Sequence, residues 1–194
     1  MRIGVLGGTF DPPHAAHAAL ARAAREQLGL DRVLWVPALS PPHKGSPAAA
    51  YEDRLAMARA LAAEDSASEV SDVEGSLPSP SYTLRTLEAL KAVHGEGHGW
   101  HLILGADNWE GFPRWHRPEA VLAAARPAVY PRKGYPLRDL PPGAAVLNFP
   151  EMPEQSTAYR EWLARDREGA LAALPASVAD CIRARNLYLS KASA

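Results

Sequence analysis

The sequence predicts a single-domain α/β fold, built on an open parallel sheet with helices on both faces and further helices at the C-terminus. Residues 1–36 contain a short apolar run, a longer amphipathic run and a second apolar run, as in a right-handed strand–helix–strand unit. This alternation continues to about residue 147 without an internal repeat or a linker. A length of 194 residues suits one domain with a substantial core, so residues 1–194 are expected to fold as one unit.

The first strand, the first helix and the second strand are the most clearly marked elements. Residues 3–6 are an apolar run typical of a strand buried on both faces, and the glycines at 7 and 8 favour a tight turn after it. Residues 17–28 are rich in Ala, with apolar residues at helical spacing, and Gly29 stands where helices commonly end. Residues 32–36 then predict the second strand.

The remaining elements follow from the same two patterns. Short apolar runs predict strands at residues 69–73, 101–104, 128–130 and 145–147. Apolar residues that recur every three or four positions predict helices at residues 51–63, 81–93, 118–125, 156–165 and 177–185. Two stretches rich in Pro and Gly, residues 37–48 and 131–143, are expected as loops at an edge of the sheet, where ligands bind in such folds.

Composition and charge restrict the partners. The chain has 21 Lys and Arg against 22 Asp and Glu, so no overall charge draws it to nucleic acid or to an anionic membrane. Cys181 is the only cysteine, which excludes an intramolecular disulfide and a metal site built from several cysteines. Asp11, Pro12 and Pro13 interrupt the first apolar run, unlike a signal peptide, and no apolar stretch approaches the roughly 20 residues that span a bilayer. We therefore expect a cytoplasmic protein without a nucleic-acid or membrane partner.

The strongest indication of chemistry is residues 7–17, Gly-Gly-Thr-Phe-Asp-Pro-Pro-His-Ala-Ala-His, between the first strand and the first helix. The glycines allow the backbone to approach a ligand, and the helix N-terminus offers free N–H groups and the positive end of a dipole to a phosphate. His14 and His17 are three residues apart, so they share a face of the helix. Each can donate to phosphate oxygens, as a cation when the phosphate raises its pKa.

Other interpretations of this segment are possible but explain less of it. Gly-Gly after a strand is often only a turn, and Asp-Pro-Pro is often only a loop. The His pair could be half of a zinc site, although no partner set of His or Glu lies nearby in the sequence. The segment is not a P-loop, because no Gly-Lys-Ser/Thr follows, and it lacks the third glycine of a dinucleotide-binding fingerprint.

Ser156, Thr157 and Arg160 form a second candidate cluster, at the start of a helix near the C-terminus. Either hydroxyl can cap this helix or donate to a phosphate, and Arg160 falls one turn later on the same side. The alternative is an ordinary helix cap followed by a solvated arginine.

Together, the two segments resemble the nucleotidyltransferases of the HxGH type, and among them the bacterial nicotinate-nucleotide adenylyltransferases. The resemblance extends from Arg2 to about Tyr188, because further segments also match. These are Val36-Pro37, Pro41-Pro42-His43-Lys44, Ser81-Tyr82-Thr83 with Thr86-Leu87, Gly105-Ala106-Asp107, Trp115 and Leu187-Tyr188. Two positions depart from the family pattern: Ala16 replaces the glycine of HxGH, and Gln155 replaces the first serine of Ser-Ser-Thr.

The resemblance implies a Rossmann-like enzyme that transfers the adenylyl group of ATP to nicotinate mononucleotide, giving deamido-NAD and pyrophosphate in NAD biosynthesis. It implies catalytic roles for His14, His17, Lys44 and Arg160. Residues implied to bind ATP are Gly7, Gly8, Thr9, Phe10, His14, His17, Gly105, Asp107, Ser156, Thr157 and Arg160. The acceptor would be bound by Lys44, Thr83 and Trp115. Mg²⁺ is expected to be carried with ATP, without a dedicated set of protein ligands.

Several alternatives stay open on sequence alone. Asp107 could bind a ribose hydroxyl or cap the next helix, and Ser81-Tyr82-Thr83 could bind the nicotinate carboxylate or cap a helix. The acceptor could instead be phosphopantetheine, nicotinamide mononucleotide or glycerol phosphate, as in related adenylyl- and cytidylyltransferases. The chain could also be a non-catalytic nucleotide sensor, although a sensor need not keep the groups that stabilise a transition state. The sequence does not predict an oligomeric state.

Overall fold

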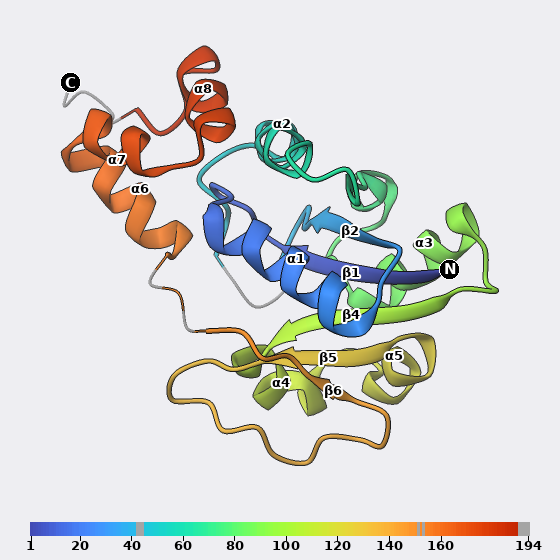
Figure 1. Ribbon diagram of the computed structural model, residues 1–194. Coiled ribbons are helices and arrows are strands. Elements are labelled where there is room, and N and C mark those ends of the chain that lie inside the picture. The colour runs from blue at the N-terminus through green and yellow to red at the C-terminus, as the bar shows by residue number, and fades with distance from the viewer. Residues whose placement is uncertain (42–44, 151, 153, 190–194) are drawn as a thin grey trace.

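The structure is a computed structural model that describes all residues except 42–44, 151, 153 and 190–194 (Figure 1). Its strands form one six-stranded sheet in the order β3-β2-β1-β4-β5-β6, and every neighbouring pair is parallel. The strands are β1 (Arg2–Gly8), β2 (Arg32–Pro37), β3 (Ser68–Val70), β4 (Gly99–Gly105), β5 (Arg126–Tyr130) and β6 (Ala145–Val146). This confirms the predicted Rossmann-like parallel sheet. The strand order reverses between β1 and β4, so ligands are expected at the carboxyl ends of these two strands.

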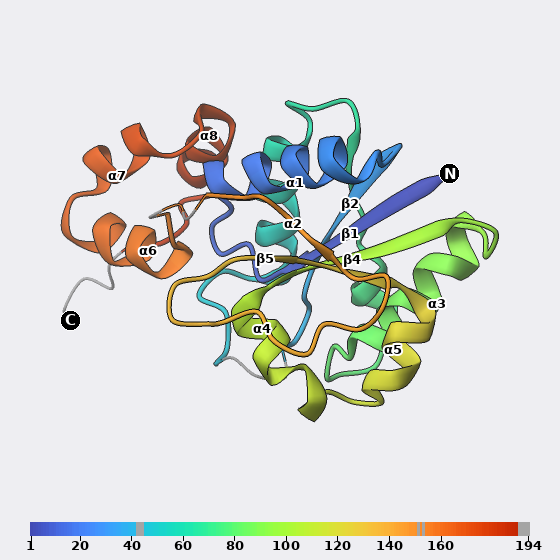
Figure 2. The same cartoon turned by 60° about the horizontal axis from the view of Figure 1, so that its bottom comes forward.

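Helices cover both faces of the sheet (Figures 1 and 2). The α-helices are α1 (Ala15–Leu28), α2 (Tyr51–Ala62), α3 (Thr83–His94), α4 (Ala106–Gly111), α5 (Pro118–Ala124), α6 (Ser156–Arg165), α7 (Arg167–Ala173) and α8 (Ala176–Ala184). Two short 3-10 helices are η1 (Val73–Ser76) and η2 (Phe112–Arg114). One core cluster joins α1, α2 and α6 to α8 on one face, and a second joins α3, α4 and α5 on the other.

β1 contributes to both core clusters, as expected of a central strand. Leu6 packs in the first cluster, whereas Ile3 and Val5 pack in the second. Alternate side chains of a strand point to opposite faces, so a continuous apolar run is needed to bury both. The run at residues 3–6 therefore has the pattern that this position in the sheet requires.

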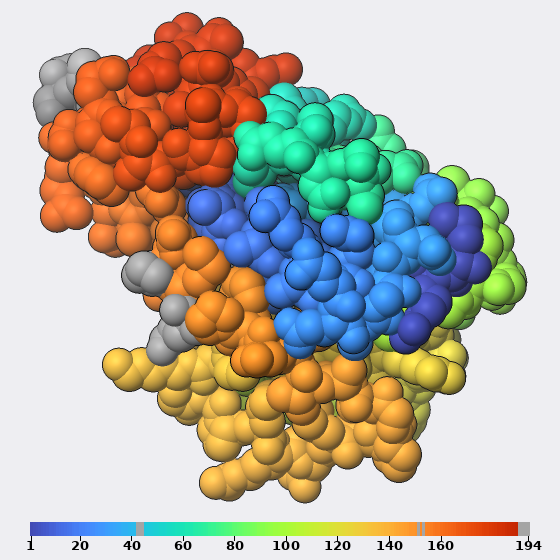
Figure 3. Space-filling model, in the orientation of Figure 1, coloured from blue at the N-terminus to red at the C-terminus, as the bar shows by residue number. Residues whose placement is uncertain are grey.

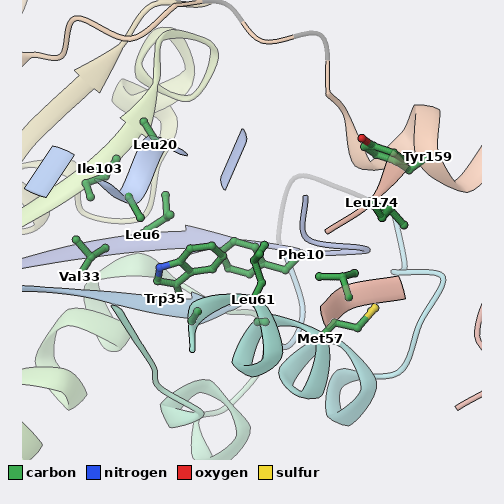
Figure 4. Packing of buried hydrophobic residues seen from close by; sticks show 14 of the residues in the cluster. Leu6, Phe10, Leu20, Val33, Trp35, Met57, Leu61, Ile103, Tyr159 and Leu174 are labelled. Atoms are coloured by element: carbon green, nitrogen blue, oxygen red, sulfur yellow. The ribbon is translucent and has the colours of Figure 1, made fainter. Parts of the chain in front are cut away.

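Phe10 anchors the turn that leads from β1 to α1 (Figure 4). Its ring is 1% exposed and stacks on Trp35 of β2, with ring centroids 5.3 Å apart and an angle of 24° between the planes. The backbone of Phe10 has φ 51°, in the left-handed region that non-glycine residues rarely adopt. Such a conformation persists only where surrounding packing holds it. Burial of the Phe10 ring therefore fixes the path of the chain just before His14.

The three C-terminal helices lie beside the sheet and pack on the N-terminal half of the chain. In Figure 3 the orange and red C-terminal part rests against the blue and green surface of α1 and α2. Val178 and Ile182 of α8 share a core cluster with Met57 and Leu61 of α2. The end of the sequence is thereby brought next to the segment that follows β1.

The loop between β5 and β6 passes over α4 (Figure 2). Trp109 of α4 is 8% exposed, and its indole N–H donates to the carbonyl oxygen of Arg138 in this loop over 2.9 Å. A buried indole N–H needs an acceptor, and the loop backbone supplies it. The predicted loop at residues 131–143 is thus tied to α4 by this hydrogen bond, and its Leu137 and Leu140 pack against the second core cluster.

Several predicted elements differ from those in the structure. Three helices follow the sheet where two were predicted, because the Asp166 side chain accepts a hydrogen bond from the Gly169 N–H over 3.0 Å and caps a separate short helix, α7. α4 was also missed, since six residues are too few to show helical periodicity. β3 ends at Val70, because the chain turns into η1 at Val73. No helix in the described part of the chain has the length and hydropathy needed to cross a membrane.

Candidate active site

Two adjoining cavities open at the carboxyl ends of β1 and β4, where the strand order reverses. The larger has a volume of about 550 Å³ and the smaller about 180 Å³. Both are lined by Leu6, Gly7, Gly8, Thr9, Asn108 and Tyr130. Two ligands bound in these cavities would therefore meet beside the turn that follows β1.

His14 and His17 line the larger cavity and contact each other directly. The backbone N–H of His14 donates to Nδ1 of His17 over 3.2 Å, and the His17 N–H donates to the His14 carbonyl oxygen over 2.9 Å. The two ring centroids are 3.9 Å apart. Because Nδ1 of His17 accepts a hydrogen bond, the neutral ring carries its proton on Nε2. Nε2 is thus the nitrogen of His17 that can donate to a ligand.

The His14 side chain is buried and held in its neutral form. It is 5% exposed, and within the described part of the protein its Nδ1 has no hydrogen-bond partner. Burial, and secondarily the positive charge of Arg132, lowers the pKa of His14 from 6.5 to about 4. A phosphate anion beside the ring would oppose both effects and raise this pKa. His14 is therefore suited to become charged only when an anion enters the cavity.

The start of α6 forms the wall of the larger cavity opposite α1. Arg160 Nη1 donates to the carbonyl oxygen of Asp11 over 2.6 Å, and Nη2 donates to Oγ1 of Thr157 over 3.0 Å. Ser156 Oγ donates to the carbonyl oxygen of Pro12 over 2.9 Å. Neither hydroxyl caps the helix, because Gln155 occupies the N-cap position and its side chain makes no capping bond. The first backbone N–H groups of α6 therefore lie at the cavity without a side-chain cap.

Arg132 is a cation of the larger cavity that the sequence did not identify. Its Nε lies 3.7 Å from Oδ1 of Asp107, and its Nη2 donates to the Tyr130 hydroxyl over 3.1 Å. Asp107 does not cap α4, since Gly105 is the N-cap residue and no side-chain cap is formed. Arg132 is the second residue after β5, and a basic residue close to the carboxyl end of a strand of a parallel sheet is the pattern that could have indicated it.

Thr83 and Trp115, predicted to bind the acceptor, both line the smaller cavity. Thr83 is the first residue of α3, where backbone N–H groups have no partner within the helix. Tyr82, at the N-cap position, forms no side-chain cap. Its ring stacks instead on His116, with centroids 4.4 Å apart. His116, which the sequence did not single out, thus completes this wall beside Trp115.

A buried ionic group supports the loops around both cavities. Arg54 of α2 is 1% exposed, and its guanidinium donates to four backbone carbonyl oxygens. The acceptors are Ala38 at 2.7 Å, Thr9 at 2.9 Å, Ala49 at 3.2 Å and Leu39 at 3.4 Å. Glu74 accepts from the Leu39 N–H at 2.9 Å and from Oγ1 of Thr86 at 2.8 Å. The segments after β1 and β2 are thereby tied to α2 and α3.

Most of the predicted site residues lie on one of the two cavities. Those on the larger cavity are Gly7, Gly8, Thr9, Phe10, His14, His17, Asp107, Ser156, Thr157 and Arg160. Gly105, the last residue of β4, was expected to contact ATP but lines the smaller cavity and not the larger one. Lys44 lies outside the described residues. Its described neighbours Gly45, Ser46 and Pro47 line the larger cavity.

Ala16, the residue that departs from the HxGH pattern, also lines the larger cavity. Its methyl group sits at the second position of α1, close to where the backbone N–H groups face a ligand. Among the residues that the structure describes, no group of three or more His, Cys, Asp or Glu side chains is arranged to hold a metal ion.

Comparisons with known proteins agree on one family. The model of the cytidylyltransferase-like family matches residues 5–162. A protein of Gloeobacter violaceus named "Probable nicotinate-nucleotide adenylyltransferase" is 38% identical over 96% of both chains. A Roseiflexus protein of the same name is 46% identical over 79% of this chain and 75% of its own. The solved structure of Plasmodium falciparum nicotinic acid mononucleotide adenylyltransferase complexed with NaAD has a similar fold, with a TM-score of 0.78, 19% identity and coverage of 96% and 97% of the two chains.

Proposed function

Because this chain belongs to the cytidylyltransferase-like family, and within it to the nicotinate-nucleotide adenylyltransferases, we propose that its two cavities hold ATP and nicotinate mononucleotide side by side. The enzyme transfers the adenylyl group of ATP to the acceptor, giving deamido-NAD and pyrophosphate in NAD biosynthesis. The observation that carries the proposal is the shared wall at Gly7, Gly8 and Thr9, where a bond between the two substrates would form.

The chemistry requires positioning more than activation. An oxygen of the acceptor phosphate attacks the α-phosphorus of ATP, and the bond from that phosphorus to the β,γ-phosphates breaks. The acceptor is already an anion, so neither a general base nor a covalent intermediate is needed. Cations and N–H donors that meet the developing charge then supply most of the rate enhancement.

The proposed roles follow from which groups lie on the larger cavity. His14 and His17 would hold the ATP phosphates, with Nε2 of His17 nearest the α-phosphate. Ser156, Thr157 and Arg160 would hold the β,γ-phosphates that leave as pyrophosphate, since α6 presents its N-terminus there. Asp107 would bind a ribose hydroxyl. By family resemblance, Lys44 would reach the acceptor and α-phosphates.

Arg132 adds a second cation to this cavity, close enough to influence His14. We include it among the groups that neutralise the phosphates. Mg²⁺ would arrive with ATP and add charge neutralisation, since it is usually bound by substrate phosphates and water rather than by an all-protein cage.

The smaller cavity would take the nicotinate ring. Trp115 offers an aromatic surface for stacking, and Thr83 offers a hydroxyl beside the free N–H groups of the first turn of α3. Donors at this position favour a carboxylate over a neutral amide, because hydrogen bonds to a charged group are roughly twice as strong. We therefore expect a preference for nicotinate over nicotinamide mononucleotide.

The test is turnover on a panel of acceptors with ATP and Mg²⁺. Nicotinate mononucleotide, nicotinamide mononucleotide, phosphopantetheine and glycerol phosphate are compared by product mass and by pyrophosphate release. We expect the highest kcat/KM with nicotinate mononucleotide. A higher kcat/KM with another acceptor would identify the protein as a related transferase, and the absence of pyrophosphate with all four acceptors would identify it as a nucleotide sensor.

We further propose that residues 1–194 work as one nucleotidyltransferase domain in the cytoplasm.

A further inference from the structure

Asp11 is the most extensively bonded carboxylate beside the larger cavity. It is 2% exposed, and both of its oxygens accept hydrogen bonds. Oδ2 accepts from the Ala48 N–H over 2.7 Å, and Oδ1 accepts from the Ala49 N–H over 3.1 Å and from the Tyr188 hydroxyl over 2.7 Å. Asp11 lines the larger cavity, but its side chain is only 3% exposed and each oxygen already accepts a hydrogen bond. A neighbouring group with more exposure is therefore better placed to carry its effect to a bound ligand.

Arg160 is that neighbour. Its Nη1 donates to the backbone carbonyl oxygen of Asp11 over 2.6 Å and lies 3.9 Å from the carboxylate oxygen Oδ2. The Arg160 side chain is 30% exposed and lines the larger cavity, so the same guanidinium faces both Asp11 and the proposed phosphate site. At 3.9 Å the carboxylate attracts the guanidinium without a hydrogen bond between them. A carboxylate that moved closer would compete with phosphate for Arg160.

Tyr188 restrains Asp11 through its hydroxyl. It lies in the segment after α8, contacts neither cavity, and has φ 55° in the left-handed region. Burial, and secondarily the carboxylate of Asp11, raises the pKa of Tyr188 far above its usual value, so the hydroxyl is a neutral donor. The backbone strain indicates that packing holds this residue in place. The adjoining carbonyl oxygen of Leu187 is itself bound by Nη1 of Arg167 over 2.9 Å.

We propose that Asp11 is a positioning residue for Arg160, and that the hydroxyl of Tyr188 holds the Asp11 carboxylate in the orientation that leaves Arg160 available to phosphate. The Ala48 N–H holds one oxygen of the carboxylate, and the Ala49 N–H and the Tyr188 hydroxyl hold the other. Without the hydroxyl, Oδ1 keeps a single partner, and the carboxylate can turn toward the guanidinium. The inference rests on the proposed function in one respect, the role of Arg160 as a ligand of the ATP phosphates.

Tyr188→Phe tests the inference because it removes one hydroxyl and keeps the ring in the core. We expect the KM for ATP to rise roughly three- to tenfold, as for the loss of one hydrogen bond. The KM for nicotinate mononucleotide should stay the same. The matched control is Tyr51→Phe, whose hydroxyl donates to the Asp72 carbonyl oxygen over 3.2 Å and faces neither cavity. This control should leave both KM values unchanged. A lower Tm for Tyr188→Phe with an unchanged KM for ATP would overturn the proposal and make Tyr188 a purely structural residue.

A double-mutant cycle identifies the route of the effect. Arg160→Ala should weaken ATP by itself, and adding Tyr188→Phe to it should then cause no further rise in KM. If the rise in KM for ATP in the double variant equalled the product of the rises in the two single variants, Tyr188 would not act through Arg160. If Tyr188→Phe does not fold by circular dichroism, Asp11→Asn tests the positioning role alone, because it removes the charge that attracts Arg160 and cannot compete for it. The KM for ATP should then rise when Arg160 is present and not in Arg160→Ala, and an unchanged KM in both backgrounds would overturn the proposal.

Direct binding separates this inference from the proposed function. The Kd of a non-hydrolysable ATP analogue, measured by calorimetry without acceptor, should rise three- to tenfold in Tyr188→Phe whichever acceptor the enzyme uses. An unchanged Kd refutes the inference even when the acceptor panel supports nicotinate mononucleotide. A raised Kd supports it even when the panel points to another acceptor.

Discussion

The backbone N–H of His14 donates to Nδ1 of His17, and this single hydrogen bond determines which nitrogen of His17 faces the larger cavity as a donor. Replacing His17 by Ala should lower kcat roughly 10²–10⁴-fold, the range for losing a group that stabilises the transition state. His17→Asn is the sharper variant, because its side-chain oxygen can still accept from the His14 N–H while the Nε2 donor is lost. We expect Asn to restore the Tm that Ala lowers, but not the kcat. Normal turnover in His17→Asn would exclude Nε2 from the reaction.

The depressed pKa of His14 predicts a pH dependence of stability. At pH values above 6.5 the ring is neutral in both the folded and the unfolded protein, so it does not make the free energy of unfolding depend on pH. Between pH 6.5 and about 4 the unfolded protein binds the proton and the folded protein does not, so the free energy of unfolding falls as the pH falls. The loss should reach roughly 3 kcal/mol by pH 4.

Urea unfolding at pH 7, 6, 5 and 4 checks this, with His14→Asn as the control. The side chain of Asn does not titrate, so the difference between the two curves isolates His14 from the carboxylates that also titrate in this range. If the free energy of unfolding changed with pH in the same way in both proteins, His14 would have the same pKa in the folded and the unfolded state.

Binding of ATP should raise the lowered pKa of His14 again. Phosphate oxygens stabilise the imidazolium, so its pKa rises and the protein takes up a proton when the nucleotide binds. Calorimetry at pH 6 in two buffers of different ionisation enthalpy measures that uptake. We expect positive uptake in the unmodified protein and much less in His14→Asn.

Arg132→Ala should act on the same histidine. Burial is the larger cause of the low pKa of His14 and the charge of Arg132 the smaller, so removal of the charge should raise the pKa only part of the way toward 6.5. The affinity for ATP should fall, since a cation of the phosphate cavity is lost. Proton NMR titration of the imidazole signals measures the first effect and calorimetry the second. An unchanged pKa would mean that burial alone determines it.

Variants of Trp115 and Thr83 should have different effects, one on the affinity for both mononucleotides and the other on the preference between them. Trp115→Ala removes a stacking surface that the nicotinate and nicotinamide rings use equally, so the KM for both mononucleotides should rise by a similar factor. Thr83→Val removes a donor but preserves shape, and the preference for nicotinate should narrow by roughly tenfold. Trp109 offers no such stacking surface, because it lines neither cavity and its indole N–H donates to the carbonyl oxygen of Arg138. Steady-state kinetics of both variants with each mononucleotide measure the two KM values and the preference.

Arg54→Met should be among the more destabilising single changes. It leaves buried carbonyl oxygens of three loop segments without their donor, and it leaves Asp11 and Glu74 without a buried positive charge. Loss of one partner from a buried ionic group costs about 3–5 kcal/mol. Arg59→Met on the same helix is the matched control, because its ion pair with Asp72 is exposed and such pairs contribute about 0–1 kcal/mol. Urea unfolding of the two variants should differ by several kcal/mol.

The elements that the sequence predicted are those whose pattern is local. The strand at residues 3–6 and the helix that ends at Gly29 combine a full repeat with a clear stop, so each could be recognised within its own window. α5, with seven residues, begins at Pro118, which marks a helix start. α4 and α7 have six and seven residues and no such proline, so the sequence did not reveal them. A side-chain cap at Asp166 decides whether the C-terminal region has two helices or three.

The site was predictable where a motif supplied it. His14, His17 and Arg160 stand in recognisable patterns. No sequence pattern predicted that Arg160 would also donate to the backbone carbonyl oxygen of Asp11. Arg54 was missed because its hydrogen-bond partners are backbone carbonyl groups, which have no residue identity to detect. Glu74 was missed because its partners, the Leu39 N–H and the Thr86 hydroxyl, are distant in the sequence.

The hydrogen bond between Asp11 and Tyr188 joins residues 177 positions apart. Every described residue that lines the smaller cavity lies at or before Tyr130, whereas the larger cavity also needs α6 and, through Asp11, the segment after α8. A truncation before α6 would therefore remove groups from the proposed ATP site and none from the walls of the proposed acceptor site.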